Sequence, residues 1–172
     1  MWQDRGAMGM EQRYFTGGWP FAPARRGARI SQEERSGRLR ALAQAPLFAN
    51  LSKRQLRSLA EVTAVTAYKE GAEVVKQGSS GSTFYVLLDG RAKVVRGGRA
   101  VARLSAGDFF GEISVLDGGP RTATVVAEAP VRCLTLGRGD FVEVLEGEPR
   151  LAVQILREVA GRLRRSERSP VS

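Results

Sequence analysis

The sequence of 172 residues contains no histidine and only one cysteine, Cys133. Without histidine the usual general base and the commonest metal ligand are missing, so most hydrolase and metalloenzyme classes are poor candidates. A single cysteine allows neither an intrachain disulfide nor a zinc site of clustered cysteines, and we expect a buried, inert thiol. No run of about 18 apolar residues occurs, so no membrane-spanning helix is predicted. We predict no catalytic residues and no metal site.

The chain carries 27 Lys and Arg against 18 Asp and Glu, a formal net charge of +9. A basic protein favours acidic partners such as a phosphate ligand, nucleic acid or an anionic surface. The excess is spread thinly along the chain, whereas nucleic-acid-binding proteins more often concentrate it on one face or arm. The length suits one domain, and 42% hydrophobic with 26% charged residues is ordinary for a soluble globular protein.

Both ends of the chain have the composition of tails. Residues 1–30 are basic and interrupted by glycine and proline, and no hydrophobic period survives there. This segment also lacks an apolar stretch of secretory length, so we predict a disordered tail on a cytoplasmic protein. Residues 167–172 form a second, short tail.

Residues 31–60 predict a helical lead-in to the domain. Ser31 and Ser52 each precede a helical pattern and are suitable N-caps, because a serine oxygen accepts from the free N–H groups of a first turn. Pro46 ends the first of the two helices.

Residues 137–166 predict two further helices. Asp140 is placed to cap the first, over 141–145, and Pro149 suits the first turn of the second. The second helix runs to about Arg165. Its apolar side consists of residues at helical spacing: Leu151, Ile155, Leu156, Val159 and Leu163. This side is expected to pack on the rest of the domain or on a second copy, which would make a homodimer.

Between the helices, residues 61–136 alternate short β-branched runs with glycine-containing turns. The runs are Val62–Tyr68, Ala72–Lys76, Phe84–Leu88, Ala92–Arg96, Ala100–Leu104, Thr122–Ala127 and Val131–Leu136. Such spacing is typical of an all-β sandwich or barrel, and Gly97-Gly98 predicts a hairpin. The predicted fold is therefore mainly β: a β-roll (a jelly-roll-like double-stranded β-helix) with N-terminal helices and a long amphipathic C-terminal helix.

Residues 107–125 combine residue types that suit an anionic ligand. Gly111 permits a tight turn and opens a helix that the Gly118-Gly119-Pro120 stretch stops within about two turns. The first N–H groups of so short a helix point into the cavity before it and bind anions, phosphate above all. Arg121, expected on the next strand, is placed to close on the same phosphate, and the Glu112 carboxylate suits a hydroxyl.

This segment resembles the phosphate-binding cassette of the cyclic nucleotide-binding domain superfamily, which includes the sensor domains of the catabolite activator protein and of cAMP- and cGMP-dependent kinases. The resemblance rests on Phe110-Gly111-Glu112, a short helix of mostly small residues, and Pro-Arg-Thr-Ala-Thr-Val at 120–125. Arg121 follows Glu112 by nine positions, as in the kinase-like cassettes. The similarity extends over roughly residues 47–165.

The resemblance implies a role for each matching residue. Glu112 would accept from the ribose 2′-hydroxyl, Arg121 would pair with the cyclic phosphate, and Ala123 would leave room for the ligand. The implied ligand-binding residues are Phe110, Gly111, Glu112, Ile113, Ser114, Arg121, Thr122 and Ala123, with Val159 and Leu163 in a lid formed by the C-terminal helix.

The resemblance also implies a sensor without chemistry of its own, which binds cAMP or cGMP and signals by repacking its C-terminal helices. We expect cAMP rather than cGMP. Few residues follow the last helix, so we expect no DNA-binding domain, and the effector would be a separate protein or a second copy. The alternatives are a ligand-free scaffold of this fold for protein interaction, a nucleic-acid-binding protein and a cupin-type enzyme. The last two are disfavoured because no recognition helix and no histidine are present.

Overall fold

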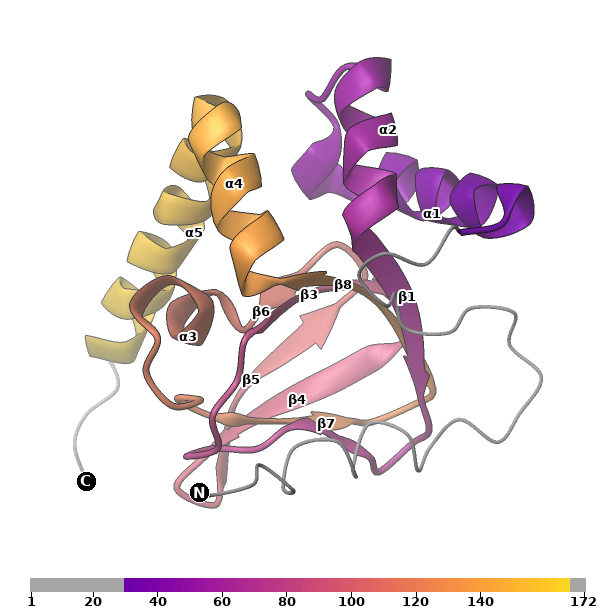
Figure 1. The fold of residues 1–172 in the computed structure, drawn as a ribbon. Helices are drawn as coiled ribbons and strands as arrows, with labels where there is room; N and C mark the ends of the chain where they lie inside the picture. Colours follow the sequence, from indigo (N-terminus) through magenta and orange to yellow (C-terminus); the bar gives the residue numbers. More distant parts are fainter. Residues whose placement is uncertain (1–29, 168–172) are drawn as a thin grey trace, which may run out of the picture.

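The computed structural model describes residues 30–167, which form two antiparallel sheets with most of the helices at one side (Figure 1). The helices are α1 (Gln32–Gln44), the 3₁₀ helix η2 (Pro46–Phe48), α2 (Lys53–Val62), α3 (Glu112–Asp117), α4 (Arg138–Gly147) and α5 (Pro149–Glu167). The strands are β1 (Thr63–Tyr68), β2 (Glu73–Val75), β3 (Thr83–Asp89), β4 (Arg91–Arg96), β5 (Arg99–Ser105), β6 (Phe109–Phe110), β7 (Thr124–Ala127) and β8 (Val131–Gly137). The predicted tails lie almost wholly outside the described residues.

Each sheet has four strands, in the orders β1-β8-β3-β6 and β2-β7-β4-β5. Every strand pair is antiparallel. The prediction of a mainly β fold with a β-roll, N-terminal helices and a long C-terminal helix is confirmed. The sequence pattern missed β6, because two residues are too few to show a period of two.

The hairpin between β4 and β5 confirms the Gly97-Gly98 prediction. Both glycines have positive φ, 55° and 78°. Two consecutive positive φ values are those of a type I′ turn, whose twist matches that of the flanking strands.

Both predicted serine caps are present. The Ser31 oxygen accepts from the Glu34 backbone N–H at 3.1 Å, and the Glu34 carboxylate accepts from the Ser31 N–H at 2.8 Å. Ser52 and Gln55 form the same reciprocal capping box at α2. The prediction that Asp140 caps its helix is wrong: α4 begins at Arg138, three residues earlier than predicted, so Asp140 lies in the first turn, where a carboxylate still suits the helix dipole.

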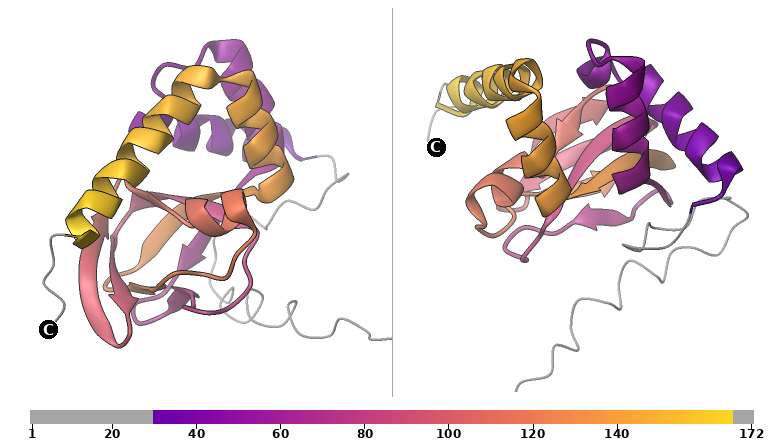
Figure 2. Two further views of the ribbon diagram at one scale, coloured as in Figure 1. Left: turned by 90° about the vertical axis from the view of Figure 1, so that its left-hand side faces the viewer. Right: turned by 45° about the horizontal axis from the view of Figure 1, so that its top comes forward.

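Side chains of the first sheet alternate between two cores. On β3, Phe84 and Val86 pack toward the helices, whereas Tyr85 and Leu87 point between the sheets. The core on the helical side also takes in Ile155 of α5, together with other residues of α1, η2, α2, α4 and α5. Figure 2 shows α5 lying along the edge of the roll. Within residues 30–167, no helix is long and apolar enough to cross a membrane.

Candidate functional site

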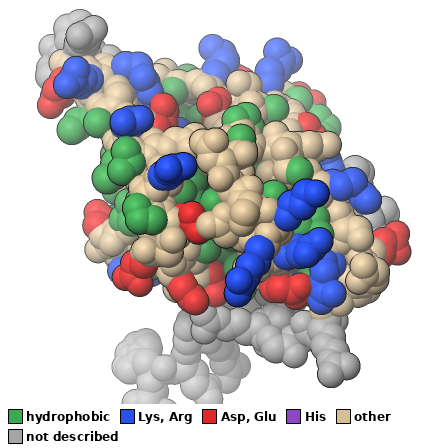
Figure 3. All heavy atoms as spheres, turned by 90° about the horizontal axis from the view of Figure 1, so that it is seen from above, with side chains coloured by type: hydrophobic (Ala, Val, Ile, Leu, Met, Phe, Trp, Pro, Cys, Tyr) green, Lys and Arg blue, Asp and Glu red, His purple; other side chains and the backbone are tan. Residues whose placement is uncertain are grey.

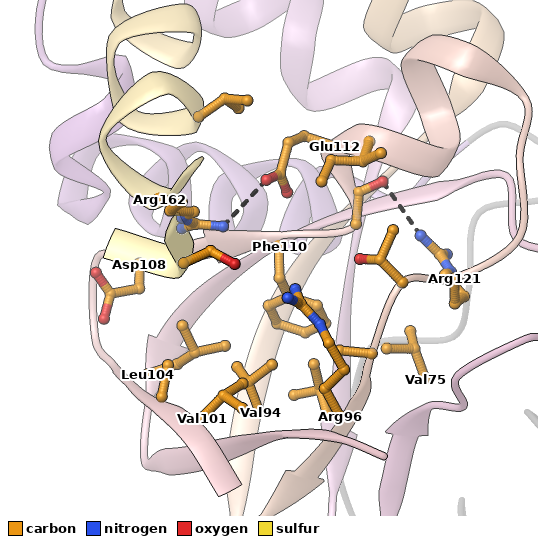
Figure 4. A pocket seen from close by; sticks show the side chains of 18 of the residues that line it. Val75, Val94, Arg96, Val101, Leu104, Asp108, Phe110, Glu112, Arg121 and Arg162 are labelled. Atoms are coloured by element: carbon orange, nitrogen blue, oxygen red, sulfur yellow. Dashed lines mark hydrogen bonds and ion pairs between the residues drawn. The ribbon is translucent and has the colours of Figure 1, made fainter. Parts of the chain in front are cut away.

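A pocket of about 520 Å³ opens between the inner face of the roll, α3 and α5 (Figure 4). All ten residues that the sequence assigns to ligand binding or to the lid line it: Phe110, Gly111, Glu112, Ile113, Ser114, Arg121, Thr122, Ala123, Val159 and Leu163. Strand β6, helix α3 with Gly111 before it, and the loop before β7 supply the first eight, and α5 supplies the last two. The structure therefore brings the predicted residues together.

Helix α3 has six residues, which is less than two turns, and lies between two glycines. Gly111 precedes it with φ +84°, and Gly118 ends it with φ +73°. A Cβ on Gly111 would lie 2.7 Å from the Arg121 guanidinium and 2.8 Å from the Thr83 carbonyl oxygen. Only glycine therefore fits at the start of α3, on grounds of both conformation and space.

The Arg121 side chain is buried, with 5% of its surface exposed. Its Nη1 donates to the Gly111 carbonyl at 3.2 Å, and its Nη2 donates to the Thr83 carbonyl at 2.8 Å. The guanidinium also lies 5.7 Å from the centre of the Tyr85 ring. These contacts from β3 and from the residue before α3 fix the plane of the guanidinium at the pocket wall.

The prediction that Arg121 lies on a strand is wrong, because β7 begins only at Thr124. The Arg121 backbone instead bonds with a neighbouring loop: its N–H donates to Ser79 at 2.8 Å, and its carbonyl accepts from Gly78 at 2.9 Å. These two backbone hydrogen bonds lie outside the paired strands. A contact between two loops therefore positions Arg121.

Glu112 opens α3 and is almost completely buried, with 3% of its surface exposed. Its Oε1 accepts from Nη1 of Arg162 on α5 at 3.1 Å. Burial raises the pKa of the Glu112 carboxyl above its ordinary value, and the adjacent positive charge of Arg162 partly opposes that shift. The carboxylate thus faces the pocket with a cation held against it.

A comparison with protein-family models matches the segment that contains this site. Residues 65–148 match the model of the cyclic nucleotide-binding domain, and the matched region contains Glu112, Arg121 and the whole of α3.

Residues 65–148 are a cyclic nucleotide-binding domain.

Individual relatives of this cyclic nucleotide-binding domain come from kinases and from a bacterial regulator. A cGMP-dependent protein kinase of Toxoplasma gondii is 38% identical over 97 residues, which cover 56% of this chain and 10% of the kinase. The cAMP-dependent protein kinase regulatory subunit of Schizosaccharomyces pombe is 31% identical over 117 residues, 63% of this chain and 28% of that subunit. The structure of the Thermus thermophilus catabolite activator protein matches with a TM-score of 0.64 at 30% identity, over 72% of this chain and 60% of that one. The chain spans less than a third of the length of these two kinase proteins.

On α5, beyond the matched residues 65–148, Arg162 is a site residue that the sequence analysis missed. Besides Glu112, it donates to the Phe109 carbonyl at 2.6 Å and to Glu158 at 3.2 Å, and its guanidinium lies 4.7 Å from the Phe109 ring centre. A signal was available, because Arg162 follows Ile155 by seven residues, which puts both on the same side of an α-helix.

The wall of the domain's pocket opposite α3 is largely apolar. Phe110 stacks on Tyr85 with ring centres 4.8 Å apart and contributes to this wall. The other apolar side chains on the roll are Val75, Val94, Val101, Ala102, Leu104, Ala123 and Val125. The charged side chains of Arg96, Arg103 and Asp108 line the pocket as well. Within residues 30–167, no three acidic, cysteine or histidine side chains stand together as a metal site requires.

Proposed function

We propose that this domain binds a 3′,5′-cyclic nucleotide, cAMP in preference to cGMP, and acts as a sensor without catalysis of its own. The observation that carries the proposal is the placement of Arg121 and Glu112, a buried cation and a buried carboxylate, beside one pocket at the start of α3. A ligand with both a phosphate and a vicinal hydroxyl matches that pair. The sensor is proposed to act in the cytoplasm, where a reduced thiol such as buried Cys133 is stable.

The cyclic phosphate is assigned to Arg121. Two backbone carbonyls fix its guanidinium, and a guanidinium fixed in this way presents parallel N–H groups to two phosphate oxygens. A hydrogen bond to a charged group contributes roughly 1.5–3 kcal/mol, so Arg121 supplies a large share of the affinity. Backbone N–H groups of Ile113, Ser114 and Thr122 are assigned to the remaining phosphate oxygens.

The ribose 2′-hydroxyl is assigned to Glu112. Arg162 holds Oε1 of this carboxylate, and a carboxylate has two oxygens that each accept more than one hydrogen bond. The ion pair also opposes protonation of Glu112, so the group is kept as the stronger, charged acceptor.

The base is assigned to the apolar wall around Phe110. Guanine carries more hydrogen-bonding groups on its edge than adenine does. An apolar wall leaves some of them without partners, at a cost of about 1–3 kcal/mol each. This argument favours cAMP. The Thr122 hydroxyl could bond to one polar group of guanine, which offsets only part of that cost.

The signal is assigned to α3 and α5. Movement of Glu112 toward the ribose would displace Arg162, and α4 and α5 would repack around the ligand with Val159 and Leu163 as a lid. A tenfold preference of the ligand for one arrangement supplies about 1.4 kcal/mol of bias. The receiver is proposed to be a separate effector protein, with a homodimer through α5 as the second arrangement to test.

Thermal shift measurements with cAMP, cGMP and 5′-AMP test the proposal. Ligand at about 100 times its dissociation constant adds roughly 2.7 kcal/mol to the stability of the folded state, which raises the melting temperature. We expect shifts with cyclic nucleotides, largest with cAMP, and none with 5′-AMP, whose open phosphate lacks the ring geometry. A larger shift with cGMP would reverse the assigned preference, and no shift with any nucleotide would favour the ligand-free scaffold.

Calorimetric titration of Arg121→Ala tests the site itself. We expect loss of measurable cAMP binding, weaker binding in Glu112→Ala, and unchanged binding in the control Arg91→Ala, since Arg91 is exposed and outside the pocket. Unchanged affinity in a folded Arg121→Ala protein would remove Arg121 from the site.

A further inference from the structure

The outward side of α5 carries an apolar stripe that the domain does not cover. Val153, Leu156 and Leu163 are 45%, 60% and 60% exposed, and Ala160 is also exposed. These four residues follow one another by three, four and three positions, which is the spacing of the contact positions of a coiled coil. Leu151 and Ile155, on the opposite side of α5, fill the core. The helix therefore has two apolar sides: one packs on the domain, and the other is exposed and meets the pocket only at Leu163.

A row of arginines runs along one edge of this stripe. Arg150, Arg157 and Arg164 are seven residues apart, so they lie above one another on α5, and all three are exposed. Among the described residues, no ion pair engages these three arginines, whereas Arg162 and Arg165 both pair with Glu158. Figure 3 shows hydrophobic side chains along the left-hand side, where α5 lies, with Lys and Arg side chains next to them at the upper left.

We infer that this surface binds an acidic amphipathic helix of a partner protein, whose apolar stripe packs on the exposed stripe of α5 and whose Glu or Asp side chains pair with Arg150, Arg157 and Arg164. Oppositely charged residues flanking an apolar seam set the choice of partner in paired helices.

Charge argues against the two occupants that this chain itself could supply. A second copy brings the same arginine row: antiparallel pairing of two α5 helices sets arginine against arginine, and parallel pairing sets it against Ala152 and Val159. The predicted tail, residues 1–30, carries five arginines and two acidic residues, so it too has the wrong sign. The net charge of +9 on the chain also favours an acidic partner.

The surface adjoins the nucleotide pocket on the same helix: Leu163 lines the pocket as well, whereas the rest of the stripe does not. Arg150, Arg157 and Arg164 do not line the pocket, whereas Arg162 and Val159 do. A partner bound to the outer side of α5 would thus contact the element that carries the Glu112 ion pair. The inference does not depend on nucleotide binding, because the surface exists without it.

Titration calorimetry with two synthetic helical peptides tests this inference on the full chain without nucleotide. Both peptides have three heptads with Leu at the a and d positions; one has Glu at e and g, and the other has Lys there. Like charges on both flanks keep each peptide from pairing with itself. We expect the Glu peptide to bind at least tenfold more tightly than the Lys peptide, with affinity that falls as salt rises.

The triple variant Arg150→Glu, Arg157→Glu, Arg164→Glu is expected to reverse this preference. Its melting temperature and its response to cAMP report on the fold separately, since these three side chains lie outside the core and the pocket. Leu156→Ser is expected to weaken the binding of both peptides. Equal affinity of the unchanged chain for the two peptides, or no binding of either, would overturn the inference. Light scattering that shows a dimer abolished by Leu156→Ser would assign the stripe to a second copy instead.

Discussion

The carboxylate of Glu112 and the guanidinium of Arg162 lie 3.1 Å apart, although fifty residues separate them in the sequence. Glu112 opens α3, the turn at the pocket, and Arg162 lies in the last third of α5. The pair therefore connects the wall of the pocket to the helix that carries the proposed lid. A group that approaches Glu112 changes the environment of Arg162 directly.

Replacement of Arg162 by methionine is expected to weaken cAMP binding about tenfold, or about 1.4 kcal/mol. Without the neighbouring cation the pKa of Glu112 rises further, so more of the carboxyl is protonated at a given pH and is a poorer acceptor for the ribose hydroxyl. Calorimetry over a series of pH values should show affinity that rises with pH in the variant, as the carboxyl ionises. The control Arg157→Met removes an exposed arginine from the same helix and should leave affinity unchanged. Affinity in Arg162→Met that equals the control would show that the ion pair does not serve binding.

The buried carboxyl of Glu112 should also make stability depend on pH. Burial raises its pKa in the folded protein above the ordinary value of 4.5, so the folded state holds this proton more tightly than the unfolded chain. The contribution is fully present below about pH 4.5 and is lost as pH rises through the higher folded pKa. In Glu112→Gln the amide oxygen can still accept from Arg162, but the side chain does not ionise. The free energy of unfolding in urea should therefore not show this loss of stability with rising pH in that variant.

The difference between the two proteins in free energy of unfolding should therefore shift in favour of Glu112→Gln as pH rises from about 4.5. Glu143→Gln, an exposed change on α4, is the matched control and should follow the unchanged protein at every pH. Parallel pH profiles for the protein and Glu112→Gln would show that the carboxyl is not destabilised by burial.

Features that depend on a few neighbouring residues were predictable from the sequence. Ser31 and Ser52 cap their helices through hydrogen bonds to residues three positions away. Gly111 and Gly118 bound α3 because their own backbone adopts the left-handed conformation. The family resemblance placed Glu112 and Arg121 at one site, because both belong to one short, continuous motif in residues 107–125. The start of α4 was misplaced because aspartate suits both a cap and a first turn.

Contacts between distant segments were not predictable in the same way. The Thr83 carbonyl that anchors Arg121 lies 38 residues earlier in the chain, and its position depends on how β3 pairs within the sheet. Arg162 depends on how α5 packs on the roll. The helical period shows which residues share a side of α5, but it does not say that an arginine on the buried side meets a carboxylate.

The thiol of Cys133 should be inert in the folded protein. Its side chain is fully buried between the sheets, and burial raises its pKa to about 12. Since the thiolate is the reactive form, Ellman's reagent at pH 8 should react only at the rate at which the protein unfolds, and at once in denaturant. Ligand-free protein that reacts rapidly in native buffer would contradict the buried position of this strand.

Alanine at Gly81 should disable the site from outside the cassette. A Cβ there would lie 2.1 Å from Nε of Arg121 and 2.4 Å from its Cζ, so the guanidinium must leave its two carbonyl partners. The φ of Gly81 is not positive, and alanine imposes no backbone strain there. We expect cAMP affinity to fall at least tenfold, with a loss of about 1–3 kcal/mol in the free energy of unfolding from two hydrogen bonds.

Gly147→Ala is the matched control for Gly81→Ala, because a Cβ at Gly147 meets nothing within 4 Å and its φ is not positive either. Calorimetry should give Gly147→Ala the affinity of the unchanged protein. If Gly81→Ala bound cAMP equally well, the guanidinium position seen here would not be the one that contacts phosphate. Loss of binding in both variants would instead indicate a general effect of helix or loop substitution, so the two proteins together separate the role of Arg121 from that of the fold.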